Sequence, residues 1–178
     1  MARVTAGKVG RRLGPLVLMI LGMLILLGAF FSYRYSEAIS EPAAALIPDS
    51  LAALPLTSSQ YGAEAVAEVS QLHGKSFPLT SGGMGIYGAQ GQITLWVTGA
   101  PASFLARRLL EEMRDKIAEG NTPFVPIGQS SLLGRTIYQL AGMGKRHYTF
   151  QSRALVIWLA ADPSVADQAL REALDFYP

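Results

Sequence analysis

The two stretches Ile93-Thr-Leu-Trp-Val-Thr-Gly-Ala-Pro101 and Leu155-Val-Ile-Trp-Leu-Ala-Ala-Asp-Pro163 decide the fold class of this chain. Each is rich in β-branched and aromatic residues, and each is followed by apolar residues at helical spacing. Such a run predicts a strand, and the proline suits the first position of a following helix. The two stretches therefore predict an α+β domain.

The elements around these stretches indicate an internal duplication. Gly83-Met-Gly85 recurs as Gly142-Met-Gly144, each before one of the two stretches. Working outward, we expect a strand-strand-strand-helix unit twice, in pseudo-repeats at about 75–120 and 132–178. The expected strands are 75–80, 85–89 and 92–98 in the first unit, and 135–141, 145–151 and 154–160 in the second. They predict an antiparallel sheet of about six strands with helices mainly on one face.

Helical periodicity predicts which side chains of the flanking helices face inward. A helix from about 59 to 72 is expected before the first unit, and residues 120–128 form a Pro/Gly-rich connection between the units. In the last helix, Asp162 suits the N-cap and Pro163 the first helical position. The residues expected to face inward there are Val165, Ala166, Ala169, Leu170, Ala173 and Phe176.

The N-terminal part of the chain predicts a membrane span. Residues 13–33 carry no charge and, as a helix, would be about 31 Å long, the thickness of a bilayer core. Four basic residues precede them, Arg3, Lys8, Arg11 and Arg12. The positive-inside rule then makes residues 1–12 a cytoplasmic basic tail and places the chain after residue 33 outside, in the periplasm or extracellular space. The alternative is a cleaved signal peptide, whose apolar core is usually only about 7–15 residues long.

The segment 34–57 is expected to be a Pro/Ala-rich apolar stalk between the span and an extracytoplasmic domain at 58–178. Its prolines prevent one continuous helix, yet it lacks the Gly, Ser and charge of a solvated linker. The apolar side chains in it are Leu46, Ile47, Leu51 and Leu54, among others. Three destinations are open for them: their own domain, the membrane surface, or another subunit.

Composition excludes several kinds of chemistry. The chain has no cysteine, so there is no disulfide, thiolate metal site or cysteine nucleophile, and its two histidines exclude a multi-histidine metal centre. Gly82-Gly-Met-Gly85 lacks the Lys-Ser/Thr of a phosphate-binding loop. With four of its 15 basic residues in the N-terminal tail, the remainder is slightly acidic and offers no surface for nucleic acid. We therefore expect no enzyme, cofactor or bound metal.

Strand alternation separates two faces of the sheet. Ile93, Leu95 and Val97 share an aliphatic face with Leu155, Ile157 and Leu159, whereas Trp96 and Trp158 lie on the opposite face, beside threonines. An exposed pair of tryptophans is typical of a binding surface; the alternative is that both are core. The candidate partner-binding residues are Trp96, Trp158, Leu46, Ile47, Leu51 and Leu54.

These features predict a non-enzymatic, single-pass accessory or scaffolding subunit. It would be held in the lipid bilayer and would contact other membrane-protein subunits through its extracytoplasmic domain and stalk. The alternative is an extracytoplasmic small-ligand-binding or sensor domain, although the sequence identifies no ligand. A closed apolar pocket with convergent polar groups would favour the ligand, and an open apolar surface would favour the partner.

Overall fold

The computed structural model describes residues 10–73 and 77–178, and the chain divides into two compact units between Glu37 and Ala38. The first unit holds most of helix α1 (Gly10–Ser40). Within α1, the 27-residue stretch Gly14–Ser40 contains an 18-residue window with a mean hydropathy of 2.5. A helix of that length spans about 40 Å, so α1 is compatible with a membrane anchor or a signal sequence. It is the one helix of this kind among the described residues.

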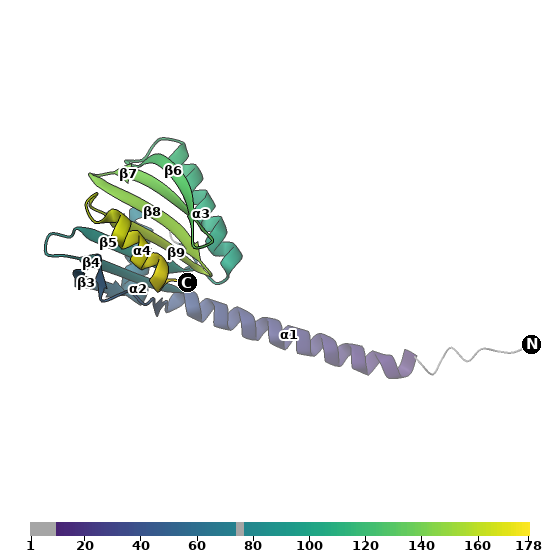
Figure 1. Cartoon of the computed structure of the whole chain (residues 1–178). Coiled ribbons are helices and arrows are strands. Elements are labelled where there is room, and N and C mark those ends of the chain that lie inside the picture. Colours follow the sequence, from purple (N-terminus) through teal and green to yellow (C-terminus); the bar gives the residue numbers. More distant parts are fainter. Residues whose placement is uncertain (1–9, 74–76) are drawn as a thin grey trace, which may run out of the picture. The chain divides into compact units, whose positions relative to one another are not determined.

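The second unit, Ala38–Pro178, is an α+β domain, and its described residues form three helices and nine strands (Figure 1). Its elements in chain order are β1 (Ala43–Ala44), β2 (Ser50–Leu51), β3 (Leu54–Tyr61), α2 (Gly62–His73), β4 (Ser81–Tyr87), β5 (Ile93–Gly99), α3 (Ser103–Ala118), β6 (Val125–Leu132), β7 (Arg135–Gly142), β8 (Lys145–Ser152), β9 (Leu155–Ala161) and α4 (Ala166–Phe176).

The strands form one sheet in the order β2-β3-β4-β5-β9-β8-β7-β6. Neighbours along this path are antiparallel, while β1 lies off the path and runs parallel to the start of β4. The centre of the sheet is the pair β5 and β9, where Trp96 lies directly opposite Trp158. The antiparallel α+β architecture is confirmed, with nine strands in place of about six.

The extra strands come from two segments that were expected to be irregular. Residues 43–61, assigned by sequence mostly to the stalk, supply β1, β2 and β3, and residues 125–132 supply β6. Because β3 continues to Tyr61, helix α2 begins at Gly62 instead of residue 59. The expected strand at 75–80 is absent from its described part, 77–80, and residues 74–76 lie outside the described part of the chain.

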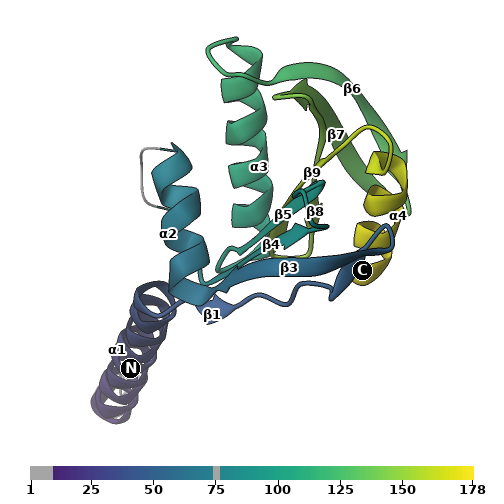
Figure 2. The same cartoon turned by 90° about the vertical axis from the view of Figure 1, so that its left-hand side faces the viewer.

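Two of the three helices of the domain lie on one face of the sheet, as predicted, and the third lies on the other face. Figure 2 shows α2 and α3 on one side of the sheet and α4 on the other. The aliphatic face packs against α4 and the segment 45–52, burying Ile93, Leu95 and Ile157 completely. The opposite face, which we call the tryptophan face because it carries Trp96 and Trp158, packs against α2 on β4 and α3 on β8 and β9.

The helix positions also break the expected duplication. The hairpin strands β4-β5 and β9-β8 are placed symmetrically about the tryptophan pair. Two antiparallel neighbours such as β5 and β9 can be exchanged only by a two-fold axis normal to the sheet. Such an axis keeps each face of the sheet on its own side. In a true duplication, the helices that follow β5 and β9 would therefore lie on the same face. Instead α3 and α4 bury their apolar sides on opposite faces.

The glycine cluster before β5 allows chain segments to approach both faces of β4 closely. A Cβ at Gly82 would lie 2.9 Å from the carbonyl oxygen of Gly62 and from a methyl of Val66, at the start of α2. On the other face, a Cβ at Gly83 would lie 2.6 Å from the carbonyl oxygen of Ala45. The sequence Gly82-Gly-Met-Gly85 is therefore a packing feature of the sheet.

The last helix differs in detail from its prediction. Asp162 and Pro163 lie in a turn, and α4 begins at Ala166 with Val165 at its N-cap. Phe176, expected to face inward, is 43% exposed, while Leu174 and Tyr177 are buried instead. The buried side of the helix still follows helical spacing, since Leu170, Ala173, Leu174 and Tyr177 lie three or four positions apart.

Candidate functional site

The tryptophan face is a sheltered layer between the sheet and two helices. Both Trp96 and Trp158 are half-buried, so neither is a fully exposed binding residue. Their cross-strand pairing follows from the direct register of β5 and β9. The sequence placed both tryptophans on this face, and the helices α2 and α3 that cover it decide how much of them solvent reaches.

Trp158 belongs to a satisfied aromatic cluster. Its indole Nε1 donates to Nδ1 of His147 at 3.1 Å, and Nε2 of the same histidine lies 3.0 Å from the carbonyl oxygen of Gly142. Phe124 packs edge-on against both rings, with centroid distances of 4.8 Å to His147 and 5.1 Å to Trp158. Burial lowers the pKa of His147; the hydrogen bond to Gly142 partly opposes this, and the charge of Lys145 adds a smaller lowering. The histidine is therefore a neutral structural bridge.

Trp96 and Thr149 are the two described residues with a buried side-chain polar atom that lacks a hydrogen-bond partner. The atoms are the indole Nε1 of Trp96 and the hydroxyl oxygen of Thr149. The strand β9 separates β5 from β8, and Thr149 lies opposite Trp158 and not opposite Trp96. The register therefore puts the three residues in one row across the tryptophan face, with Trp158 between Trp96 and Thr149.

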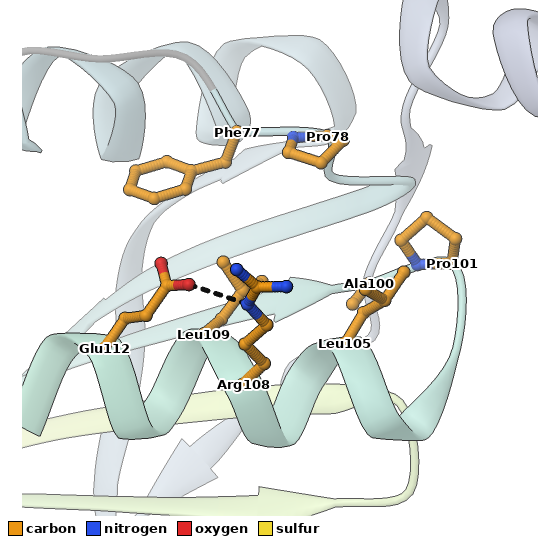
Figure 3. Close-up of a pocket in the computed structure, with 8 residues that line it drawn as sticks. All are labelled: Phe77, Pro78, Ala100, Pro101, Leu105, Arg108, Leu109 and Glu112. Carbon is orange, nitrogen blue, oxygen red and sulfur yellow. Dashed lines mark hydrogen bonds and ion pairs between the residues drawn. The ribbon is translucent and has the colours of Figure 1, made fainter.

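One open apolar site among the described residues is a groove of about 280 Å³ between α3 and the segment after α2 (Figure 3). It is lined by Phe77, Pro78, Ala100, Pro101, Leu105, Arg108, Leu109 and Glu112. In Figure 3 the side chains of Arg108 and Glu112 extend from α3 toward Phe77 and Pro78. We call this site the α3 groove.

The chemistry of the α3 groove is that of an apolar slot with one ion pair at its mouth. Arg108 Nε donates to a carboxylate oxygen of Glu112 at 2.9 Å, and these side chains are 74% and 48% exposed. The pair follows from the i, i+4 spacing on the helix. Leu105 and Leu109 form the wall behind it and are partly buried against the core of α3. The other lining residues are apolar.

The four leucine and isoleucine residues expected in the stalk do not form one surface. Ile47 and Leu51 are buried in the main core, 8% and 1% exposed, and Leu54 packs partly buried against it. Leu46 is 78% exposed, although its carbonyl oxygen accepts a hydrogen bond from the hydroxyl of Tyr177 at 2.9 Å. Ile47 and Leu51 therefore pack on their own domain, and not on a membrane surface or another subunit. This packing is possible because the glycines of β4 let the segment lie directly on the sheet.

Sequence reasoning missed the α3 groove. It predicted a helix after Pro101 but assigned residues 75–80 to a strand. The segment with Phe77 and Pro78 runs irregularly instead and leaves a gap beside α3. Pro78 and Pro101 were the available signals, since each proline favours an irregular segment at the end of an element.

The described residues hold no group of three or more His, Asp or Glu side chains that could bind a metal ion. Burial raises the pKa of Tyr87 and of Tyr177, and each hydroxyl donates to a main-chain carbonyl, of Pro48 and Leu46 respectively. These tyrosines hold the segment 46–48 against the domain.

Comparisons of the chain with protein-family models, curated proteins and solved structures find no match.

Proposed function

We propose that this protein is a non-enzymatic membrane-anchored accessory or scaffolding subunit whose outer domain binds another membrane-protein subunit through the α3 groove. The single observation that carries the proposal is this open apolar slot on the surface of the domain. The apolar helix α1 supports the anchor, since its length exceeds the usual core of a signal peptide. The basic tail before it supports a cytoplasmic N-terminus and an outer domain in the periplasm or extracellular space.

The size of the groove favours a partner protein over a small ligand. Its volume of about 280 Å³ is at or below the lower end of small-molecule sites, roughly 300–1,000 Å³. A slot of that size accommodates one or two apolar side chains, and such anchors in desolvated pockets dominate protein interfaces. The exposed Arg108–Glu112 pair would then lie at the polar rim of the interface.

The alternative, a small-ligand or sensor domain, lacks a comparable observation. A small ligand in the α3 groove would need polar groups of the protein to orient it. The two polar side chains in the lining, Arg108 and Glu112, are already paired with each other. The two buried polar atoms without partners, on Trp96 and Thr149, belong to residues outside the groove lining. The geometry therefore favours the partner.

The test is co-purification of the full chain from its own membranes in mild detergent, with subunits identified by native mass spectrometry. The groove variant exchanges the ion pair, R108E together with E112R, which keeps both exposed side chains and their attraction but reverses the charges at the rim. The matched control exchanges the exposed pair Lys116–Glu119 on the same helix in the same way.

We expect wild type and the control to retain another membrane subunit in fixed stoichiometry, and the groove variant to lose it by about fivefold or more. An intact chain mass of 19.1 kDa in the membrane fraction supports the uncleaved anchor. Recovery of the chain without any other subunit would refute the proposal, and so would equal retention by the two exchanged variants. A bound small molecule that is lost only from the groove variant would establish the alternative.

A further inference from the structure

The strand β6 is an open edge of the sheet. It ends the strand path and pairs only with β7 among the described strands. Its residues are exposed on both faces, apart from a half-buried Ser130. Apolar side chains are included, with Val125 61% and Ile127 54% exposed. At the opposite end of the sheet, β2 already pairs with the first residues of β3.

The hairpin between β6 and β7 shows which main-chain groups of β6 point outward. Two residues, Leu133 and Gly134, both with positive φ, connect the closing pair Leu132–Arg135. In such a hairpin the closing pair is hydrogen-bonded, and hydrogen-bonded pairs then alternate along the ladder. Ser130 is therefore bonded to β7. Gln129 and Ser131 lie at non-bonded positions, so their N–H and C=O groups point away from the sheet.

The edge carries little protection against pairing with another strand. Natural edges are usually guarded by charged side chains, proline or a bulge. Residues 121–134 contain no charged residue, and Arg135 donates to the carbonyl oxygens of Leu174 and Tyr177. The guards that are present, Pro126 and the irregularity between Pro126 and Gly128, lie in the first half of the strand. The second half is left open.

We propose that the open half of β6 pairs antiparallel with the same strand of a second copy of this chain. The pairing is self-complementary when Ser130 lies opposite its counterpart, because Gln129 then faces Ser131 of the other copy. Each of these two equivalent pairs exchanges two main-chain hydrogen bonds, and the symmetry is that of a two-fold dimer. An uncharged strand meets its own copy without like-charge repulsion, which favours a second copy as the occupant.

Cysteine crosslinking tests the pairing directly, since the chain has no native cysteine. In the proposed register the two Ser130 residues form a non-bonded pair with Cα atoms about 4.5 Å apart, within reach of a disulfide. The variant S130C should therefore form a covalent dimer under mild oxidation of the full chain in mild detergent. The matched control is T136C on β7, which is exposed like β6 but lies more than three strand spacings, over about 14 Å, from its counterpart.

A charge-exchange pair tests the register. Gln129 and Ser131 are both exposed, so charged side chains at these positions should be tolerated by the monomer. Adding Q129K and S131K to S130C places lysines opposite lysines, and should lower the crosslinked fraction roughly fivefold, because like charges directly opposite destabilise a strand pair. Adding Q129K and S131E instead places lysine opposite glutamate and should keep the fraction at or above that of S130C.

A covalent dimer of S130C that is absent from T136C, together with this charge pattern, would support the proposal. It would be overturned by a monomeric S130C, by equal crosslinking of S130C and T136C, or by equal effects of the two charge combinations. The outcome is independent of the proposed function, because the α3 groove and its charge-exchange variants involve other residues. A heteromeric contact at the groove can be lost while the β6 pairing persists, and the reverse also holds.

Discussion

Replacing Gly83 by alanine should destabilise the domain by forcing apart two main-chain segments. The new Cβ would lie 2.6 Å from the carbonyl oxygen of Ala45 and 3.2 Å from a methyl of Ile47. Carbon and oxygen atoms of this kind normally stay about 3.3 Å or more apart, so the segment must move by about 0.7 Å. That movement strains the adjacent hydrogen bond from Ala45 N to the carbonyl oxygen of Gly82, 2.9 Å in the wild type.

The magnitude follows from two opposing effects. Overpacking a core site costs about 1–3 kcal/mol, and the upper part of that range applies because main chain, not a flexible side chain, must move. The loss of glycine flexibility in the unfolded chain returns about 0.4–1 kcal/mol. We expect a net loss of about 2 kcal/mol, which for a domain of roughly 140 residues lowers Tm by about 6–8 °C.

The assay is urea and thermal unfolding of the full chain in mild detergent, followed by tryptophan fluorescence. Both tryptophans of the chain lie on the central strands β5 and β9, so the signal reports the sheet. The matched control is Gly128→Ala on β6, where an added Cβ meets nothing within 4 Å. The control should unfold at or slightly above the wild-type temperature. If Gly83→Ala unfolds at the same temperature as the control, the close packing of residues 45–47 on β4 is refuted.

Three further predictions concern the groups described above. Because burial lowers the pKa of His147 below its ordinary 6.5, the unfolded chain takes up the proton first; stability should be complete above about pH 6.5 and fall as the pH drops toward the folded-state pKa. Chemical denaturation from pH 8 to 5 should show this loss, and H147Q should lack it. Trp158→Phe should cost about 1–2 kcal/mol by breaking the bond to His147, whereas Trp96→Phe, which removes an unpaired N–H, should stay within about 1 kcal/mol of wild type; equal losses in denaturant titrations would contradict the assignment. Glu172→Ala removes the carboxylate that accepts from the main-chain N–H of buried Ala52 at 2.6 Å, and should cost about 1.5–3 kcal/mol in thermal unfolding; Glu172→Gln, which keeps an acceptor, should cost clearly less.

The proposed dimer and the α3 groove have different consequences for an assembly. Pairing at β6 would join two copies of this chain, and the groove would attach each copy to a different subunit. If α1 anchors the chain as proposed, tethering in one bilayer would raise the effective concentration of the copies, so even a short strand pairing could be populated there. If both proposals hold, the two surfaces would make the protein a scaffold with one symmetric and one heteromeric contact.

Local sequence patterns predicted the C-terminal part of the domain well. The strands at 135–141, 145–151 and 154–160 were each placed within about one residue of β7, β8 and β9. The two-residue period of β5 and β9 correctly separated the aliphatic face from the tryptophan face. These strands are recognisable because a strand with one buried face has apolar and polar residues in alternation along its own sequence.

The edge strands were harder to predict for a physical reason. The exposed residues of β6 and the mostly exposed residues of β3 show little apolar alternation, since main-chain pairing with one neighbour is enough to hold an edge strand. The segment with Phe77 and Pro78 was likewise misassigned, and with it the α3 groove. A groove is a space between segments, and no single segment carries a pattern for it.

The sequence by itself determined the elements whose signals are local. These are the apolar helix α1, the core strands with their two faces, and the amphipathic character of α3 and α4. Only the tertiary structure decided that α3 and α4 pack on opposite faces, that the segment 45–52 lies in the main core, and that Trp96 meets Trp158. Periodicity records which side of an element is apolar, but the surface it meets depends on contacts between residues far apart in the chain. The approach of Ala45 to Gly83 is one such contact, and the shapes of both segments are needed to form it.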